Sequence, residues 1–383
     1  MKRFCLILLS VLMCVFLIVS CEPQKPVDEV VNVNVEITNK DDLSKCYWRY
    51  TAVKTDTTGF TTGEKREETP LAENKNLSLS TGEWKISLFG YENDSYINLL
   101  YKGEANVSVT RENSSIKVPV VGEYPAKIGD SYYENAEEAL KNIDESVKDV
   151  TVSLGKSNLS LESGIFNAGN KSKNITFVGE LDSDNKPLST VNVAEKAVSA
   201  EGAKHLNYQR GSSFTFENLT IQAGTGDFDG IVCDELTYKN CTIKGKLTLY
   251  GKATFINCTF ENDNDDDAIY YSIWTWGGTD VKFEGCTFNT KGKAINLYGQ
   301  ATAEKPTNLT VNNCTFNDRN NGTAGKAAIE IGNDYNATYT LTINNATVNG
   351  FAEGENTGSK LWANKKSMDA AHLSVTIDGK KVL

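Results

Sequence analysis

The segment Ala253-Thr-Phe-Ile-Asn-Cys-Thr-Phe260 decides the fold, because it recurs along the C-terminal part of the chain. Five further segments align with it without gaps: Phe214–Ile221, Leu236–Ile243, Val281–Phe288, Leu309–Phe316 and Leu341–Val348. The fifth position of each segment falls at residues 218, 240, 257, 285, 313 and 345, which are 22, 17, 28, 28 and 32 residues apart. Constant segments joined by loops of variable length are typical of one structural unit that repeats as a stack.

The residue types within the repeat predict coils of β-strands. Apolar and polar residues alternate with period two, which excludes helical repeats, and propeller blades need about 40 residues each. The third and eighth positions are mostly aromatic or aliphatic and are predicted to fill the core. The fifth position is Asn or Gly, the residues that best tolerate a left-handed bend. The sixth position forms one inward column: Leu219, Cys241, Cys258, Cys286, Cys314 and Ala346.

This pattern resembles the right-handed parallel β-helix of the pectin-lyase-like superfamily, and we assign it to residues 123–383. A second recurring element lies between the repeats, as in Lys246–Gly251, Lys293–Gly299 and Ala328–Gly332. One helix is predicted over residues 132–146, with Asn135 as its N-cap. Such a helix would cover the open N-terminal end of the stack.

Residues 30–122 have a different pattern, with short alternating strands separated by turn residues. About six or seven strands are expected there, including Val31–Ile37, Trp84–Leu88 and Val107–Val109. This number of strands fits a small β-sandwich of immunoglobulin-like character. The predicted fold class is therefore all-β, with a sandwich followed by a β-helix.

The N-terminus resembles the signal peptide of bacterial lipoproteins. Lys2 and Arg3 precede an apolar stretch that ends in Ile18-Val19-Ser20-Cys21, which is similar to a lipobox. The resemblance implies that residues 1–20 are removed and that Cys21 receives the lipid, which leaves residues 21–29 as a tether. The predicted location is the cell envelope, at the outer membrane, the cell surface or the outer face of the plasma membrane. The membrane would be a partner through the lipid at Cys21.

Composition narrows the functional classes. The 383-residue chain has a net charge of −11, which argues against nucleic acid as a partner. Only two histidines occur, which disfavours His-based metal sites and catalytic triads. Six cysteines remain after the predicted lipidation site, and four of them stand in the inward column. Side chains stacked in parallel do not point at each other, so we expect mostly reduced thiols there.

Catalysis is not supported by the motifs. The resemblance would imply an enzyme that acts on acidic polysaccharides. Some members of the superfamily use Asp-bound Ca²⁺ with an Arg or Lys base, and others use clustered Asp residues. None of the triplets typical of such sites, Asn-Thr-Asp, Gly-His-Gly or Arg-Ile-Lys, occurs in this sequence. Asp229, Asp267 and Glu330 are the carboxylates expected on the coil surface, and nothing in the sequence makes them converge. The sequence favours a non-catalytic protein that requires no cofactor.

Two local features are candidate sites. Asp263, Asp265, Asp266 and Asp267 share one loop, which is either a Ca²⁺ site or a solvated acidic turn. The aromatic segment that follows is either a platform for sugar rings or part of the core. If it is a strand, its residues Tyr270, Trp274 and Trp276 share one face.

Three functions remain open. The leading hypothesis is a non-catalytic, lipid-anchored envelope protein whose β-helix binds a polysaccharide or a surface protein. A polysaccharide lyase or glycoside hydrolase with an unrecognised site is the first alternative. A structural spacer without a ligand is the second.

Overall fold

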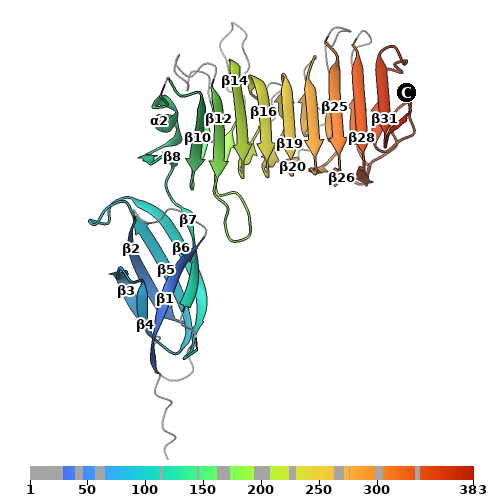
Figure 1. Ribbon diagram of the computed structural model, residues 1–383. Helices are drawn as coiled ribbons and strands as arrows, with labels where there is room; N and C mark the ends of the chain where they lie inside the picture. Colours follow the sequence, from blue (N-terminus) through green and yellow to red (C-terminus); the bar gives the residue numbers. More distant parts are fainter. Residues whose placement is uncertain are drawn as a thin grey trace, which may run out of the picture. The chain divides into compact units, whose positions relative to one another are not determined.

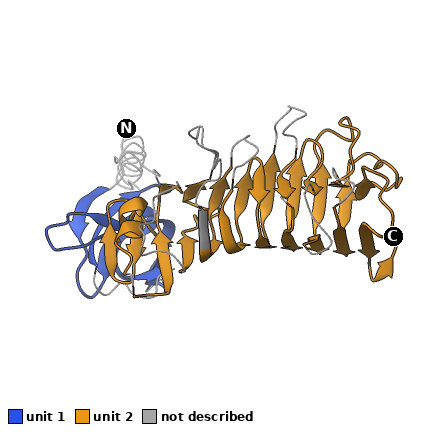
Figure 2. Ribbon diagram, turned by 90° about the horizontal axis from the view of Figure 1, so that it is seen from above, with its two compact units in different colours: residues 1–120 blue, residues 121–383 orange. Residues whose placement is uncertain are grey.

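The computed structural model divides the chain into two compact units, residues 1–120 and 121–383 (Figure 2). The residues that it describes are 29–38, 46–56, 65–112, 115–144, 146–161, 173–193, 208–223, 230–262, 271–275, 277–297, 305–332 and 337–383, without the side chains of 208–210.

Unit 1 contains seven strands, which are hydrogen-bonded in the order β3-β2-β5-β6-β7-β1-β4. Their bounds are β1 Val30–Thr38, β2 Tyr47–Lys54, β3 Lys65–Pro70, β4 Asn76–Ser80, β5 Gly82–Tyr91, β6 Leu99–Val109 and β7 Ser115–Gly122. Alternate side chains are buried, among them Val33 and Val35 of β1 and Trp84 and Ile86 of β5, so the unit has its own core.

The number of strands agrees with the prediction of six or seven, with two differences in the strands themselves. The segment Val107–Val109 is the end of β6 and not a separate strand. Strands β3 and β4 were not predicted, because the residues of β3 are almost all charged or polar and the alternation in β4 involves only two apolar side chains, Leu77 and Leu79.

Unit 2 is a parallel β-helix, which confirms the predicted fold class (Figure 1). Its largest sheet has twelve strands in the order β32-β31-β28-β25-β22-β19-β16-β14-β12-β10-β8-β9. Their bounds are β8 Ala126–Ile128, β9 Ser131–Tyr133, β10 Asp149–Leu154, β12 Asn174–Gly179, β14 Tyr208–Glu217, β16 Val232–Lys239, β19 Lys252–Ile256, β22 Asp280–Glu284, β25 Thr307–Asn312, β28 Tyr339–Asn344, β31 Leu373–Ile377 and β32 Lys380–Lys381.

Two further sheets complete the coils. The second sheet consists of β11 Asn158–Ser160, β13 Thr190–Asn192, β15 Thr220–Gln222, β17 Thr242–Lys244, β20 Thr259–Asn262, β23 Thr287–Thr290, β26 Thr315–Asp318 and β29 Thr347–Asn349. The third consists of β18 Leu247–Leu249, β21 Ile273–Thr275, β24 Ile295–Leu297, β27 Ile329–Ile331 and β30 Trp362–Asn364. The first two sheets contain the repeat, and the third contains the second recurring element.

The bend between the first two sheets lies at the fifth position of the repeat. Every residue there has a positive φ between 51° and 63°: Asn218, Asn240, Asn257, Gly285, Asn313 and Asn345. Asn side chains at this bend also bond from coil to coil, since Nδ2 of Asn345 donates to Oδ1 of Asn313 at 2.9 Å. The sequence prediction of a left-handed bend is confirmed.

This geometry predicts how Asn240 responds to substitution. Asn240→Ala should destabilise the protein by about 1 to 2 kcal/mol, because a Cβ without a polar side chain disfavours the left-handed region. Asn240→Gly should cost less, because glycine adopts this conformation freely. Urea denaturation of both variants measures the difference. Equal losses would show that the bond from Asn240 to Asn218, 3.3 Å long, matters more than the backbone conformation.

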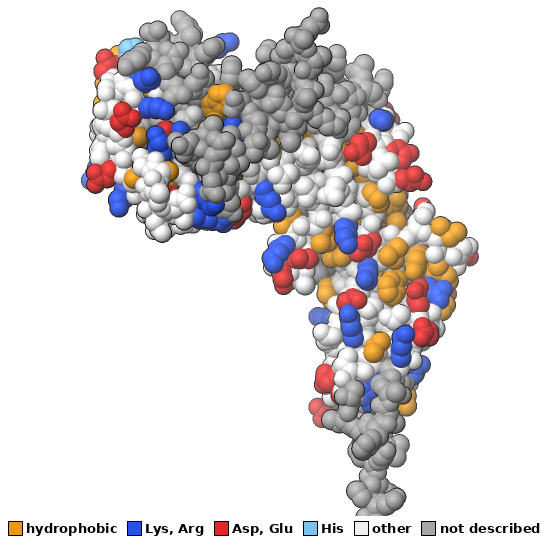
Figure 3. All heavy atoms as spheres, turned by 180° about the vertical axis from the view of Figure 1, so that it is seen from behind, with side chains coloured by type: hydrophobic (Ala, Val, Ile, Leu, Met, Phe, Trp, Pro, Cys, Tyr) orange, Lys and Arg blue, Asp and Glu red, His pale blue; other side chains and the backbone are white. Residues whose placement is uncertain are grey.

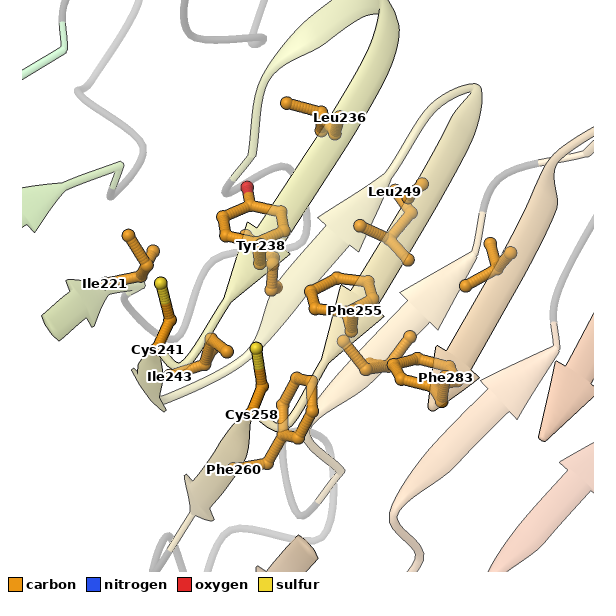
Figure 4. Close-up of a cluster of buried hydrophobic side chains, with 14 of the residues drawn as sticks. Ile221, Leu236, Tyr238, Cys241, Ile243, Leu249, Phe255, Cys258, Phe260 and Phe283 are labelled. Carbon is orange, nitrogen blue, oxygen red and sulfur yellow. The ribbon is translucent and has the colours of Figure 1, made fainter. Parts of the chain in front are cut away.

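The core of unit 2 contains two stacks of aromatic rings, and Figure 4 shows Tyr238, Phe255 and Phe283 of the first and Phe260 of the second. In the first stack, Tyr238 and Phe255 have ring centroids 4.8 Å apart, and Phe255 and Phe283 are also 4.8 Å apart. In the second stack, the ring centroids of Phe288 and Phe260 are 4.3 Å apart, and Phe316 stacks on the other side of Phe288. The rings stack because the strand register places the same position of successive repeats side by side.

The sixth position forms the inward column that the sequence predicts. Cys241, Cys258, Cys286 and Cys314 are buried, and Cys241 and Cys258 are visible beside the rings in Figure 4. All six cysteines from Cys46 onward are free thiols. Hydrogen bonding to the neighbouring Cys258 and burial raise the pKa of the Cys286 thiol to about 12.

We expect these four thiols to be protected from reaction with thiol reagents while the protein is folded. A buried, protonated thiol reacts only after an opening of the structure, which makes its reaction at least about a thousandfold slower than in the unfolded chain. Titration of residues 22–383 with a chromogenic disulfide at pH 8, with and without urea, measures this. Rapid reaction of all six thiols without urea would contradict the burial of the column.

The two ends of the stack are covered differently. The helix α2, Ala136–Lys141, lies at the N-terminal end, and the Asn135 side chain accepts a hydrogen bond from the backbone N–H of Glu138 as predicted. The helix is shorter than the predicted span of 132–146, because Ser131–Tyr133 pairs as strand β9 on its N-terminal side and Asn142 is the C-cap on the other. At the other end, β31 and β32 form an antiparallel pair.

Candidate functional site

The outward column of the third sheet differs from an ordinary solvent-facing column. Thr248, Trp274, Asn296, Glu330 and Ala363 stand in register at the centre of its five strands. Apart from Thr275 and Asn364, the flanking residues of each strand belong to the hydrophobic core. Four members of the outward column are nevertheless buried as well, and only Trp274 is partly exposed.

Two buried lysines lie against the aromatic rings at this column. The Nζ atom of Lys246 lies 5.1 Å from the ring centroid of Tyr271 and 5.8 Å from that of Trp274. The Nζ atom of Lys293 lies 5.3 Å from the Tyr271 centroid. An ammonium group at this distance from a ring face is attracted by the ring quadrupole. Tyr271 is therefore flanked by a cation from the coil on either side.

Glu330 is the centre of a charge cluster, formed with Lys293, Lys326 and Lys365. Its carboxylate lies 2.7 Å from Nζ of Lys293, 3.3 Å from that of Lys326 and 3.9 Å from that of Lys365. Glu330 is 4% exposed and Lys293 is 6% exposed, so the shortest ion pair is buried. Removing either partner of such a pair leaves an uncompensated buried charge.

Burial and charge act on the two partners in different ways. Burial lowers the pKa of Lys293, because it disfavours the ammonium form, and the attraction of Glu330 only partly opposes this. For Glu330, burial alone would raise the pKa, but the three lysines outweigh it and hold the pKa below its ordinary value. Glu330 is therefore ionised at neutral pH, and Lys293 is easier to deprotonate than an exposed lysine.

Only one of the predicted site residues lies within this region of the described chain. Trp274 is central in β21, which pairs with Leu247–Leu249 and Ile295–Leu297, and it points outward as the glycan-platform hypothesis requires. Several predicted residues lie outside the described part of the chain: Cys21, Asp263, Asp265, Asp266, Asp267, Tyr270 and Trp276.

The sequence did not reveal the charge cluster. Glu330 was expected to lie alone on the coil surface, whereas in the structure it is buried among lysines. A signal was present, because Lys246 and Lys293 both begin the second recurring element. Lys293 is 37 residues from Glu330 in sequence, and loops of variable length separate their coils, so the sequence alone could not place them together.

The described residues contain neither a metal-binding cluster nor a membrane-spanning helix. No group of three or more His, Cys, Asp or Glu side chains is arranged there to hold a metal ion. No helix within the same residues is long and apolar enough to cross a bilayer.

Comparisons with known proteins find little similarity. No protein-family model matches the sequence, and no curated protein sequence matches it. Among solved structures, the chain is similar to the crystal structure of the pectate lyase Pel3 from Pectobacterium carotovorum, with 14% sequence identity and a TM-score of 0.28. The alignment covers 91% of this chain and 100% of the lyase chain.

Proposed function

We propose that this protein is a non-catalytic, lipid-anchored protein of the cell envelope and that its β-helix binds a polysaccharide at the outward column of the third sheet. The observation that supports this most directly is the partial exposure of Trp274 in a column whose other members are buried. An indole ring offers a flat apolar surface for the C–H face of a sugar. Beneath it, the buried Lys246 ammonium group attracts the indole ring and helps to fix its orientation.

The binding proposal is tested with soluble protein that begins at Glu22. Native gels that contain neutral or acidic polysaccharides, run with and without Ca²⁺, show binding as retarded migration. Trp274→Ala should weaken retardation about tenfold or more, because it removes the exposed ring. Thr254→Ala, on the outer surface of the first sheet, is the matched control and should have no effect. Unchanged retention of Trp274→Ala on every polysaccharide would refute the proposed site.

A polysaccharide lyase is the second candidate, and Lys293 is the observation that favours it. A lyase needs a base that removes a proton next to the sugar carboxylate, and Lys293 combines a position beside Tyr271 and Glu330 with a pKa that burial lowers. Assays for newly formed sugar ends over hours separate the two functions. Release of sugar ends that is lost in Lys293→Met, with folding confirmed by circular dichroism, would replace the binding proposal by the enzyme.

The lipid anchor has its own test. The lipobox-like segment ends at Cys21 and predicts lipidation there. When cells that express the full-length protein are fed a radioactive fatty acid, the protein should become labelled. Cys21→Ser should abolish the label and release the protein from the membrane fraction. Labelling that persists in Cys21→Ser would contradict lipidation at this residue.

A further inference from the structure

Unit 1 carries an aromatic surface that the proposed function does not use. Figure 3 shows hydrophobic side chains gathered on the face of unit 1 that is seen from behind. On β2, β5 and the turn that follows β5, aromatic and aliphatic side chains reach the solvent: Tyr47, Phe89, Tyr91, Tyr96 and Ile97. Tyr47 is 47% exposed and Ile97 is 58% exposed. We call these five residues the tyrosine platform. Aromatic side chains that reach the solvent together on one face make that face a candidate interaction site.

The rings of the platform are held in place by charged neighbours. The Tyr91 hydroxyl donates a hydrogen bond of 3.0 Å to Glu68, and Nε of Arg49 lies 2.9 Å from the same carboxylate. The Arg49 guanidinium in turn lies 4.5 Å from the ring centroid of Tyr96. The Tyr91 and Tyr96 rings meet edge to face, with centroids 5.6 Å apart. Side chains that are fixed before a ligand arrives lose little entropy on binding it.

The backbone of the turn that follows β5 holds Tyr96 in an unusual conformation. Tyr96 has a φ of 55°, a region that bulky residues rarely adopt. The Asn93 side chain supports this turn, because its oxygen accepts hydrogen bonds from the backbone N–H groups of Ser95 and Ile97. A strained conformation that other contacts maintain at a surface aromatic residue suggests a role for that residue.

We propose that the tyrosine platform is a second carbohydrate-binding site, independent of the site on the β-helix, and that it takes a short stretch of a glycan chain. The strand register places Tyr47 opposite Tyr91, and Arg49 opposite Phe89. Ring faces therefore lie beside a guanidinium and a carboxylate. A sugar needs both kinds of group, because its C–H face is apolar and each of its hydroxyls both donates and accepts.

Size and position favour a glycan over a protein or a membrane. Two strands with two positions along each cover roughly 5 by 7 Å, and the turn adds two side chains, so the platform is far smaller than the roughly 800 Å² that each partner contributes to a stable protein interface. The platform lies where β5 ends, at Tyr91. The chain enters unit 1 at the opposite end, where the backbone of Glu29 bonds to Thr81, just before β5 begins at Gly82. A ten-residue strand spans about 30 Å, so the platform is remote from the predicted tether.

The test uses the whole chain from Glu22 and the same polysaccharide gels. Tyr96→Ala and Tyr91→Ala should each weaken binding of at least one polysaccharide about tenfold, and Tyr91→Phe should retain most of it because the ring stays. Val30→Ala, which alters an exposed apolar residue near the tether, is the matched control and should bind normally. Thermal unfolding confirms that each variant is folded.

The two sites are distinguished by combining variants. Binding that persists in Trp274→Ala and disappears when Tyr96→Ala is added supports the platform. Complete loss of binding in Tyr96→Ala alone also supports the platform, but it would contradict the proposed site on the β-helix. Binding that Trp274→Ala alone abolishes, or that no platform variant changes, would overturn this inference. Absence of binding to every glycan by the unaltered protein would overturn both proposals.

Discussion

Glu330→Gln is expected to lower the free energy of unfolding by about 3 to 5 kcal/mol, the cost of removing one partner from a buried ion pair. The substitution preserves the shape of the side chain and removes its charge. Lys293, which is buried with it, would then lack the carboxylate 2.7 Å away that compensates its charge. Urea denaturation followed by circular dichroism at pH 7 measures the loss.

The pH dependence of this loss identifies its electrostatic origin. The pKa of Glu330 in the folded protein lies below its ordinary value of 4.5, so the unfolded chain binds its proton first as the pH falls. The stabilisation from Glu330 is thus present above pH 4.5 and disappears as the pH falls through the folded pKa. The difference between the unaltered protein and Glu330→Gln should therefore shrink at acidic pH.

A matched exposed pair serves as the control. Glu104 forms an ion pair of 2.9 Å with Lys85, but both side chains are nearly half exposed. Glu104→Gln should cost less than about 1 kcal/mol, as is usual for surface pairs. If Glu330→Gln costs no more than Glu104→Gln, the charge cluster does not contribute to stability as its burial predicts.

Phe255→Ala should cost about 3 to 5 kcal/mol, because it opens a cavity in the middle of the first aromatic stack. The Phe255 ring contacts two partners in that stack, Tyr238 and Phe283, each at a centroid distance of 4.8 Å. Neighbouring coils are bonded by short parallel strands and cannot collapse into the space without losing register.

Two further variants calibrate this prediction. Phe255→Leu retains most of the volume and should cost less than about 1.5 kcal/mol. Thr254→Ala, one residue away on the outer surface, should change stability by no more than about 0.5 kcal/mol. The three variants are compared by urea denaturation. Similar losses for Phe255→Ala and Thr254→Ala would mean that the stack tolerates a cavity.

The fold could be predicted largely because a given position of the repeat has the same structural role in each copy. Asn257 and its equivalents mark a left-handed bend, and Cys258 and its equivalents mark a narrow inward column. The bend recurs in all six copies of the repeat, so these imperfect copies of the pattern reinforce each other. The short strand β3 was missed because nothing repeats it and its residues are almost all polar or charged.

The candidate site could be predicted only in part, for a physical reason. Alternation grouped Trp274 with Tyr270 and Trp276 on one face but left open whether that face is exposed, and in β21 Trp274 is partly exposed between two buried neighbours. Alternation says nothing about whether an outer position is covered, and Glu330 is outward-pointing yet buried. Contacts such as that between Glu330 and Lys293 depend on which coils become neighbours, which the variable loops decide.

The stacking of coils also has an evolutionary consequence. Between the antiparallel pairs at its two ends, each described strand of the β-helix pairs with its counterparts in the coils before and after it. Duplication of a DNA segment that encodes one whole coil would therefore insert a unit whose bends, rings and thiols continue the existing columns. The molecule would grow by about 4.8 Å for each added coil. The length of the β-helix can thus increase during evolution by one coil at a time, while the elements that cover its two ends stay the same.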